Sequence, residues 1–391
     1  MTGQMVDERV SEGVDALLDD FVAITGGDTF VITYTPDSRE PAAWVALGLK
    51  HRGFNPAIVP MLPLKDESFA GRLAEALPDQ SALQGRLVII TLERDTMSHF
   101  DVFQPILRHY GPDKTMILRI ISASADFFTK ALNVSPMGLS TLNATLLHRV
   151  DSARRVRVTT SGGTDITVEL DSEKYQWISN RGVWRPGGFT ILPAGEIATY
   201  PVSVEGVLVA DGAYNANIIS DLNAKLADNP VRVEIEAGKA RDLTCDNAKL
   251  QEMFRLCLDS PNGRNIGEFG LGTNHGIDEY VTANSHINER RCGLHLGFGQ
   301  HNQSFSRVPY AAYAHLDLIT DGGLMWIDDD VDPIDLSHVE PLDVPHPADA
   351  LDEDITGDCC GMGYRQLKGL SDPSCVIPEA SPERGSDTLR I

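Results

Sequence analysis

The chain has 391 residues, of which 42% are hydrophobic, and its formal charge is −23. A length beyond one ordinary core predicts two domains and a tail. The acidic charge argues against a nucleic-acid partner, because binding to phosphates depends on lysine and arginine. No apolar run approaches the roughly 20 residues of a membrane-spanning helix, so we expect no membrane partner either.

The amino terminus and the cysteines indicate a cytoplasmic protein. Residues 1–20 are acidic and lack the basic start and apolar centre of a secretion signal. The six cysteines show no C-x-x-C spacing, which argues against structural zinc and predicts free thiols in a reducing compartment. Cys292 lies three residues before His295, where we expect a small buried residue rather than a ligand.

Residues 1–150 alternate between short apolar runs and amphipathic segments. This alternation predicts parallel crossovers and therefore an open α/β sheet of the doubly wound type. No G-x-G-x-x-G or G-x-x-x-x-G-K-[ST] motif lies at a strand-to-helix turn, so we expect an architectural domain. The predicted strands are 29–35, 56–62, 86–92 and 114–122, and the predicted helices are 8–24, 39–53, 68–77 and 100–110.

From about Arg154 the pattern changes to short β segments, which predicts a domain boundary near residue 150. A hairpin is expected around Gly162 and Gly163, and a helix over 246–260. Glu196 stands in a Gly- and Pro-rich stretch, so we expect it in a loop or at the start of a strand. The predicted fold is α/β: an amino-terminal parallel-sheet domain (1–150) followed by a β-rich α+β domain (151–327).

Residues 328–391 are predicted to form an acidic extension. Its first part, 328–358, holds twelve Asp or Glu, no Lys or Arg, and four prolines. Such a composition buries little apolar surface, so we expect a loosely packed and partly disordered segment.

The chemistry of the chain is concentrated between Asn265 and Asp317. His315 and Asp317 stand two residues apart in an apolar run, so on a strand both side chains point to the same face. Taken alone, this pair is more readily explained as a buried histidine satisfied by a neighbouring aspartate. Glu268 and His295 also lie in short apolar runs with glycines, where an unpaired carboxylate would be costly without a cation.

Several motifs in order resemble a known enzyme family. They are G-T-D, L-P-A-G-E, N-I-G-E-F-G-L-G-T-N, G-L-H-L-G-F-G and H-L-D, over residues 159–319. This order resembles the catalytic domain of the thermophilic-type metalloaminopeptidases, the leucyl aminopeptidase-like family of aminopeptidase T and aminopeptidase S. The resemblance implies a hydrolase with two divalent ions (Zn²⁺, Mn²⁺ or Co²⁺), whose activated water attacks the carbonyl of a peptide or small-molecule amide. We also expect a homodimer.

The resemblance assigns roles to particular residues. Glu196 would bind one metal ion, and Glu268 would bridge the two as the catalytic carboxylate. The remaining ligands would be His295, His315 and Asp317. Glu289 is a further candidate, either as the general base or as a charge partner of Arg290 and Arg291.

After the histidine motif the chain departs from the family pattern, since it reads FGQHNQSFSRVPY. We expect Gln300, His301 and Asn302 at the rim of the substrate pocket, with Tyr310 or Tyr313 in place of the family's tyrosine. The histidines in polar loops, His275, His286 and His301, are expected at the periphery, where His275 can still line the pocket.

Two alternatives remain. The sequence also resembles the 2,5-dihydroxypyridine dioxygenases, which have a similar fold and bind a single Fe²⁺ through two His and one Asp. Their pattern has a His where this chain has Glu268 and lacks a histidine at the position of His295, so these two residues favour the dinuclear hydrolase. The other alternative is a tailoring or peptide-binding accessory protein on the same scaffold.

Overall fold

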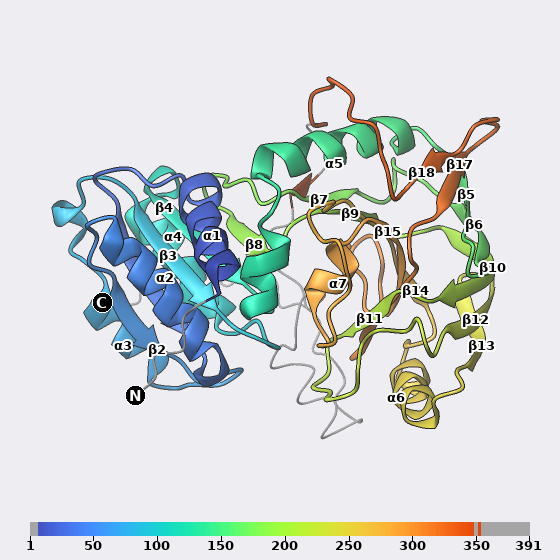
Figure 1. The fold of residues 1–391 in the computed structure, drawn as a ribbon, viewed down its shortest axis with the longest axis horizontal. Helices are drawn as coiled ribbons and strands as arrows, with labels where there is room; N and C mark the ends of the chain where they lie inside the picture. Colours follow the sequence, from blue (N-terminus) through green and yellow to red (C-terminus); the bar gives the residue numbers. More distant parts are fainter. Residues whose placement is uncertain (1–6, 348–350, 353–391) are drawn as a thin grey trace.

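The computed structural model describes residues 7–347 and 351–352, which form two parts side by side along the long axis of the molecule (Figure 1). One part is built on a parallel sheet and the other on antiparallel sheets, so the predicted α/β fold class is confirmed. Among the described residues, no helix is both long and apolar enough to cross a membrane.

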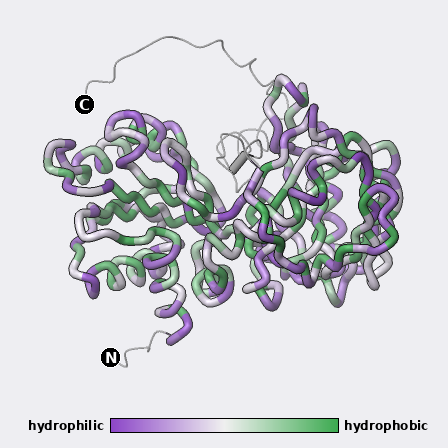
Figure 2. The backbone as a smooth tube through the Cα atoms, turned by 90° about the horizontal axis from the view of Figure 1, so that it is seen from above, coloured by the Kyte–Doolittle hydropathy of each residue, from purple (hydrophilic) through white to green (hydrophobic). Residues whose placement is uncertain are grey.

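The amino-terminal part contains a five-stranded parallel sheet in the order β2-β1-β3-β4-β8. Helices cover both faces, so the central strands are buried and form the hydrophobic middle of this part (Figure 2). The strands are β1 (Thr29–Tyr34), β2 (Ala57–Pro60), β3 (Leu87–Leu92) and β4 (Thr115–Ile120). The helices of this part are α1 (Glu8–Ala16), α2 (Arg39–His51), α3 (Phe69–Ala76) and α4 (Phe100–Tyr110), with short turns η1 (Leu17–Phe21), η2 (Pro36–Ser38), η3 (Gln80–Ala82), η4 (Pro112–Lys114) and η5 (Phe127–Ala131). The next helix, α5 (Pro136–Val150), lies against the second part, where Leu146, Leu147 and Val150 enter the core.

The fifth strand of this sheet comes from beyond the predicted boundary. β8 (Phe189–Leu192) pairs in parallel with β4, so the boundary near residue 150 leaves one strand of the sheet on its far side. Directly after β8, a cis Leu192–Pro193 peptide bond and two more residues lead to Glu196. The carboxyl end of the parallel sheet therefore delivers one of the predicted metal ligands to the second part.

A buried ion pair joins two strands of the parallel sheet. Nη2 of Arg119 lies 3.0 Å from Oε1 of Glu93, and each side chain is only 1% exposed. The backbone N–H of Ser98 also donates to Glu93 at 2.9 Å. The guanidinium of Arg119 lies 5.2 Å from the ring of Phe103 and 5.8 Å from that of Phe189. This pair ties β3, β4, α4 and β8 together at one point of the sheet.

The second part contains two seven-stranded sheets that enclose one hydrophobic core with α6 (Ala248–Asp259). The outer sheet has the order β13-β12-β10-β6-β5-β17-β18, and the inner sheet, next to the amino-terminal part, has the order β11-β16-β15-β14-β9-β7-β19. The outer strands are β5 (Arg155–Thr159), β6 (Asp165–Glu169), β10 (Ser203–Ala210), β12 (Val231–Glu236), β13 (Lys239–Thr244), β17 (Leu324–Ile327) and β18 (Ile334–Asp335). The inner strands are β7 (Ile178–Asn180), β9 (Glu196–Thr199), β11 (Ala213–Ala216), β14 (Ile266–Gly272), β15 (Gly293–Gly299), β16 (His315–Ile319) and β19 (Leu351–Asp352), and α7 (His286–Arg290) lies beside them.

The start of the predicted acidic extension is packed more closely than its composition predicts. Leu336 is 2% exposed and belongs to the core between the two sheets. The backbone N–H of Leu342 donates to Oγ1 of Thr145 at 2.9 Å, and Nε2 of His346 lies 2.9 Å from Oγ of Ser179. Apart from β19, the rest of the extension beyond residue 347 lies outside the described residues.

We predict that Glu93→Ala lowers the free energy of unfolding by about 3–5 kcal/mol, because it leaves the guanidinium of Arg119 buried without its carboxylate. Urea denaturation followed by far-UV circular dichroism measures this loss. Asp165→Ala is the matched control, since it breaks an ion pair with Arg157 in which both side chains are more than half exposed. The control should cost at most about 1 kcal/mol. Equal losses in the two variants would contradict the role given to the buried pair.

Candidate metal centre

The five predicted ligands lie on one face of the inner sheet. Leu296 and Leu316 belong to the core between the two sheets, so the residues beside them, His295, His315 and Asp317, point to the opposite face. This is the side on which the amino-terminal part lies. The strand alternation predicted for His315 and Asp317 thus gives the observed arrangement.

Cross-strand register brings the ligands of neighbouring strands together. Asp317 on β16 is opposite Gly297 on β15, which is in turn opposite Glu268 on β14. His295 is opposite Gly270 in the same ladder. Residues directly opposite each other in an antiparallel pair share a face and lie within contact distance. The ligands therefore converge around positions where the sheet carries glycine instead of a side chain.

A β-bulge turns Glu268 toward this face. Between Ile266 and Glu268 the register advances two residues on β14 but only one on β15. Ile266 points into the core, and regular alternation would send Glu268 there as well. The extra residue, Gly267, reverses that direction, as bulges commonly do near functional sites. A side chain at Gly267 would collide with the backbone, since its Cβ would lie 2.6 Å from the carbonyl oxygen of Gln300.

The ligand atoms form two groups that share Glu268. Glu196, Glu268 and His295 make one group, and Glu268, His315 and Asp317 make the other, each with its ligand atoms within 4.8 Å of one another. Nε2 of His295 lies 2.8 Å from Oε1 of Glu196 and 3.4 Å from Oε1 of Glu268. Nε2 of His315 lies 3.1 Å from Oδ1 of Asp317.

The glycines of the sheet are required for this convergence. A Cβ at Gly297 would lie 2.8 Å from Cβ of Glu268, 2.9 Å from Cε1 of His315 and 3.0 Å from Oδ1 of Asp317. A Cβ at Gly270 would overlap the imidazole ring of His295. Because such approaches are closer than side chains tolerate, any larger residue at either position would push ligands apart.

The polar atoms of the cluster fit a cation. Neither ring nitrogen of His295 and neither carboxylate oxygen of Asp317 makes a hydrogen bond, although both side chains are fully buried. Buried polar atoms are normally hydrogen-bonded. Here the short distances between ligand atoms bring lone pairs together without a hydrogen between them. Imidazole and carboxylate suit Zn²⁺, Mn²⁺ and Fe²⁺ alike, so these residues can hold a divalent ion without selecting one.

Arg290 offsets part of the negative charge of the cluster. Its Nη1 pairs with Oε2 of Glu196 and lies 3.0 Å from Oε1 of Glu289, and its Nε donates to the carbonyl of Pro193 at 3.1 Å. Glu289 thus pairs with Arg290, one of the two arginines predicted as its charge partners. Arg291, by contrast, pairs with Asp321.

The pKa values of two buried carboxylates of the cluster, Glu289 and Asp317, shift in opposite directions. Burial and the neighbouring charges of Asp317 and Glu268 raise the pKa of Glu289 well above its ordinary value. Burial acts in the same direction on Asp317, but the neighbouring imidazole of His315 outweighs it and lowers the pKa of Asp317. Asp317 therefore favours the ionised form that a metal ion needs, whereas Glu289 favours the protonated form.

Neighbouring backbone and amide groups orient the ligands. Nδ1 of His315 lies 2.8 Å from the carbonyl oxygen of Gln300, so it carries the hydrogen and leaves Nε2 with its lone pair toward the cluster. Nδ2 of Asn143 donates to the carbonyl of Glu196 at 2.9 Å, and Nδ2 of Asn215 donates to Oε2 of Glu289 at 2.7 Å. The asparagines are buried and carry no motif, so the sequence offers no signal for them.

The expectation that His286 lies at the periphery is wrong. It is 6% exposed at the start of α7, and its backbone N–H donates to Oγ of Ser122, which follows β4. Burial lowers its pKa to about 4, and Asp317 and His315 are its titratable neighbours. Its polar sequence context misled because the segment folds into the contact between the two parts. The sequence did offer one signal of a helix here, because Ser285 is a typical helix-capping residue. Its side chain accepts from the N–H of Ile287 at the start of α7.

The residues expected at the pocket rim mainly shape the loop between β15 and β16. The side-chain oxygen of Gln300 accepts from the N–H of Ala312 at 2.8 Å. Nε2 of His301 lies 2.7 Å from the carbonyl of Tyr310, whose hydroxyl donates to the carbonyl of Gly299 at 3.1 Å. Tyr313 is half-buried, and its carbonyl accepts from Nδ2 of Asn217. Their contact with a substrate remains a prediction.

His275 lies beside a different cavity. It is exposed and lines a cavity of about 200 Å³ together with Cys292, Leu146 and the segment 336–341. None of the five predicted ligands lines this cavity. Cys292 is a free thiol whose pKa is raised to about 11 by burial.

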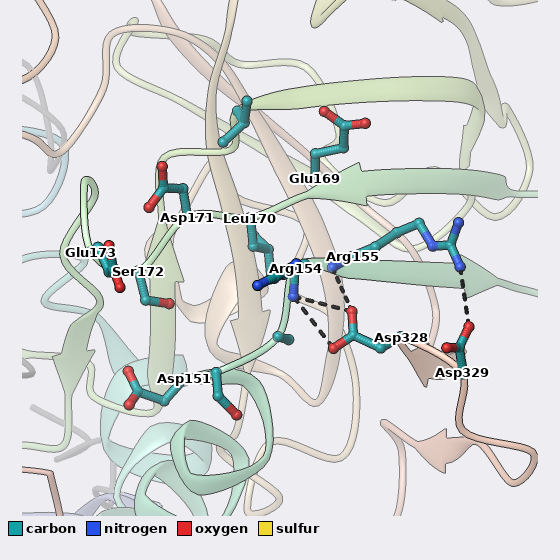
Figure 3. Close-up of a pocket in the computed structure, with 13 residues that line it drawn as sticks. Asp151, Arg154, Arg155, Glu169, Leu170, Asp171, Ser172, Glu173, Asp328 and Asp329 are labelled. Atoms are coloured by element: carbon teal, nitrogen blue, oxygen red, sulfur yellow. Dashed lines mark hydrogen bonds and ion pairs between the residues drawn. The ribbon is translucent and has the colours of Figure 1, made fainter.

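A wide cavity of about 1180 Å³ lies at the beginning of β5 and is also separate from the ligands (Figure 3). Asp328 accepts from the backbone N–H groups of Arg154 and Arg155, and the guanidinium of Arg155 lies 3.7 Å from Asp329. Acidic side chains of Glu169, Asp171 and Glu173 complete much of its wall. These contacts tie the start of the extension to β5, and they bring no imidazole to the cavity.

Comparisons with known proteins find one matching family and solved structures of similar fold. The profile of the NicX family, 2,5-dihydroxypyridine 5,6-dioxygenase, matches residues 72–330. The structure of the 2,5-dihydroxypyridine dioxygenase from Pseudomonas putida KT2440 is similar with a TM-score of 0.55 at 16% identity, covering 88% of this chain and 97% of that chain. Wild-type AmpT from Thermus thermophilus is similar with a TM-score of 0.50 at 15% identity, covering 84% of this chain and 97% of that chain. At these identities the structural likeness shows a shared fold alone, and no curated protein matches the sequence.

We predict that Gly297→Ala lowers the metal content of the purified protein at least tenfold, because the added methyl would lie 2.8 Å from Cβ of Glu268 and 2.9 Å from Cε1 of His315 and would push these ligands apart. Elemental analysis by mass spectrometry measures the content, and circular dichroism checks that the variant is folded. Gly71→Ala is the matched control, since a Cβ there meets nothing within 4 Å. An unchanged metal content in folded Gly297→Ala would contradict the ligand roles of Glu268 and His315.

Proposed function

The chain belongs to the 2,5-dihydroxypyridine 5,6-dioxygenase family, and on that premise we propose that it is a metal-dependent dioxygenase that opens the ring of a dihydroxylated aromatic compound. The observation that carries the proposal is the family match over residues 72–330, because this range contains every candidate ligand. The family match supports this function over the hydrolase that Glu268 and His295 favour in the sequence alone.

We propose that Glu268, His315 and Asp317 hold a single Fe²⁺ ion. Two carboxylates and one imidazole offer it three protein ligands, and Nε2 of His315 is directed toward it by the carbonyl of Gln300. When bound, Fe²⁺ would supply the chemistry by which O₂ reacts with an aromatic ring.

The protein's own residues would exclude water and handle protons. Each of the three proposed ligands is at most 6% exposed, so bulk water is kept from their ligand atoms. Glu289 is the candidate for proton transfer, because its raised pKa moves it toward the range useful for a general acid or base. Asn215 and Arg290 hold its two oxygens, at 2.7 Å and 3.0 Å.

A second candidate function is the aminopeptidase-like hydrolase. It is favoured by one specific observation, the two ligand groups that share Glu268, because a shared carboxylate is what a two-metal site needs. The structural likeness to AmpT is compatible with it. In this case Glu196 and His295 would hold the second ion, and the substrate would be a peptide or a small amide.

An experiment that varies both the metal ion and the substrate distinguishes the two proposed functions. We predict that protein reconstituted anaerobically with Fe²⁺ consumes O₂ when 2,5-dihydroxypyridine or a related dihydroxylated ring is added, with loss of the aromatic absorbance. The same protein loaded with Zn²⁺, Mn²⁺ or Co²⁺ is tested on amino-acid p-nitroanilides. Hydrolysis without any O₂ uptake would sink the dioxygenase and establish the second candidate.

We predict that His315→Ala abolishes turnover and lowers metal occupancy by at least tenfold, because it removes a ligand that the carbonyl of Gln300 orients. The amino-terminal part should stay folded, since His315 belongs to the inner sheet. Initial rates, metal content and circular dichroism measure the three effects. His51→Ala, at an exposed histidine of α2, is the control that keeps full activity. Turnover at the normal rate in His315→Ala would remove this residue from the site.

A further inference from the structure

We propose that Asn302 is a positioning residue that sets the orientation of the Glu268 carboxylate and thereby the metal affinity of the centre. The proposal rests on the metal-binding role given to Glu268 above, but it holds for either reaction. Nδ2 of Asn302 donates to Oε2 of Glu268 at 3.0 Å, and Asn302 itself is half-buried at the edge of the cluster.

The orientation of the Asn302 amide follows from a chain of hydrogen bonds whose directions are all determined. The backbone N–H of Gln176 can only donate, and it donates to Oε1 of Gln303 at 3.0 Å. The other end of the Gln303 amide, Nε2, must then donate, and it reaches the carbonyl of Gln176 at 2.9 Å and Oδ1 of Asn302 at 2.8 Å. Asn302 is thus left with Nδ2 toward Glu268.

This series of hydrogen bonds begins at a residue that is fixed to the inner sheet. The carbonyl of Gln176 also accepts from Oγ1 of Thr199 at 3.1 Å, and Thr199 ends β9, the strand that Glu196 begins. Gln176 therefore connects the turn after β15 to the strand that carries another ligand. A displacement of Gln303 would be transmitted to Asn302 without any direct contact between Gln303 and Glu268.

The bond to Asn302 distinguishes the two oxygens of Glu268. Oε2 is held by the amide, whereas Oε1 lies 3.4 Å from Nε2 of His295. The same turn orients His315 through the carbonyl of Gln300. Two members of one ligand group are therefore aligned by a single short segment. Groups that orient metal ligands in this way typically change metal affinity by about 10–100-fold when they are removed.

Two variants of the chain test the proposal. Asn302→Leu keeps the size of the side chain and removes the donor. Gln303→Glu replaces the donating Nε2 by an oxygen, which can only accept. The Asn302 amide then reverses, so that its Nδ2 donates to residue 303 and its Oδ1 faces Glu268. Each should weaken the binding of Mn²⁺ or Co²⁺ about 10–100-fold in a chelator competition and change the visible absorption of the Co²⁺-loaded protein. A negative charge added near the ion would by itself strengthen binding, so weaker binding by Gln303→Glu is specific to the reversed amide.

The double variant gives a second readout. If Gln303 acts only through Asn302, then Gln303→Glu adds no further loss to Asn302→Leu. Ser306→Ala, an exposed position of the same loop, is the control with unchanged affinity and spectrum. Circular dichroism verifies folding. Two results would overturn the proposal. One is a metal affinity of folded Asn302→Leu within twofold of the native protein, and the other is a loss in the double variant that equals the sum of the two single losses.

Failure of the proposed function would look different. Native protein that binds metal ions but neither consumes O₂ nor opens a dihydroxylated ring would refute the dioxygenase while leaving the affinity losses of both variants intact. Native O₂ uptake together with unchanged metal affinity in Asn302→Leu would refute only the role of Asn302.

Discussion

The structure depends on an electrostatic constraint, the burial of four carboxylates around one face of the inner sheet. Glu196, Glu268, Glu289 and Asp317 are each at most 6% exposed. Arg290 pairs with two of them, but one guanidinium cannot offset four carboxylates, even with Glu289 shifted toward its protonated form. Because an unpaired buried charge is costly, this cluster is suited to a bound cation. The rest of the second part holds the carboxylates close together.

Backbone features produce this closeness. Gly270 and Gly297 leave room for the ligands of adjacent strands, and the bulge at Gly267 turns Glu268 out of the core. The parallel sheet contributes as well, since β8 leads directly to Glu196 and Ser122 contacts α7. In open α/β sheets, binding sites lie beyond the carboxyl ends of the strands. The candidate centre obeys this rule although most of its ligands come from the other part.

The shared fold does not by itself choose the reaction. The family match supports a dioxygenase, and the two overlapping ligand groups are what a dinuclear hydrolase would use. Both functions draw on the same residues and differ in the number of ions. Glu268 is the residue on which this difference turns, because it belongs to both groups. Its orientation by Asn302 therefore bears on the chemistry of either enzyme.

Local patterns in the sequence were sufficient for the α/β alternation of the first 150 residues and for the common face of His315 and Asp317, because both follow from periodicity within one element. Only the tertiary structure could add β8 to the parallel sheet, reverse Glu268 by a bulge, bury His286 between the two parts and set Asn302 against Glu268. Each of these depends on residues far apart in the chain, and periodicity carries no information about which distant strands pair or where their register shifts.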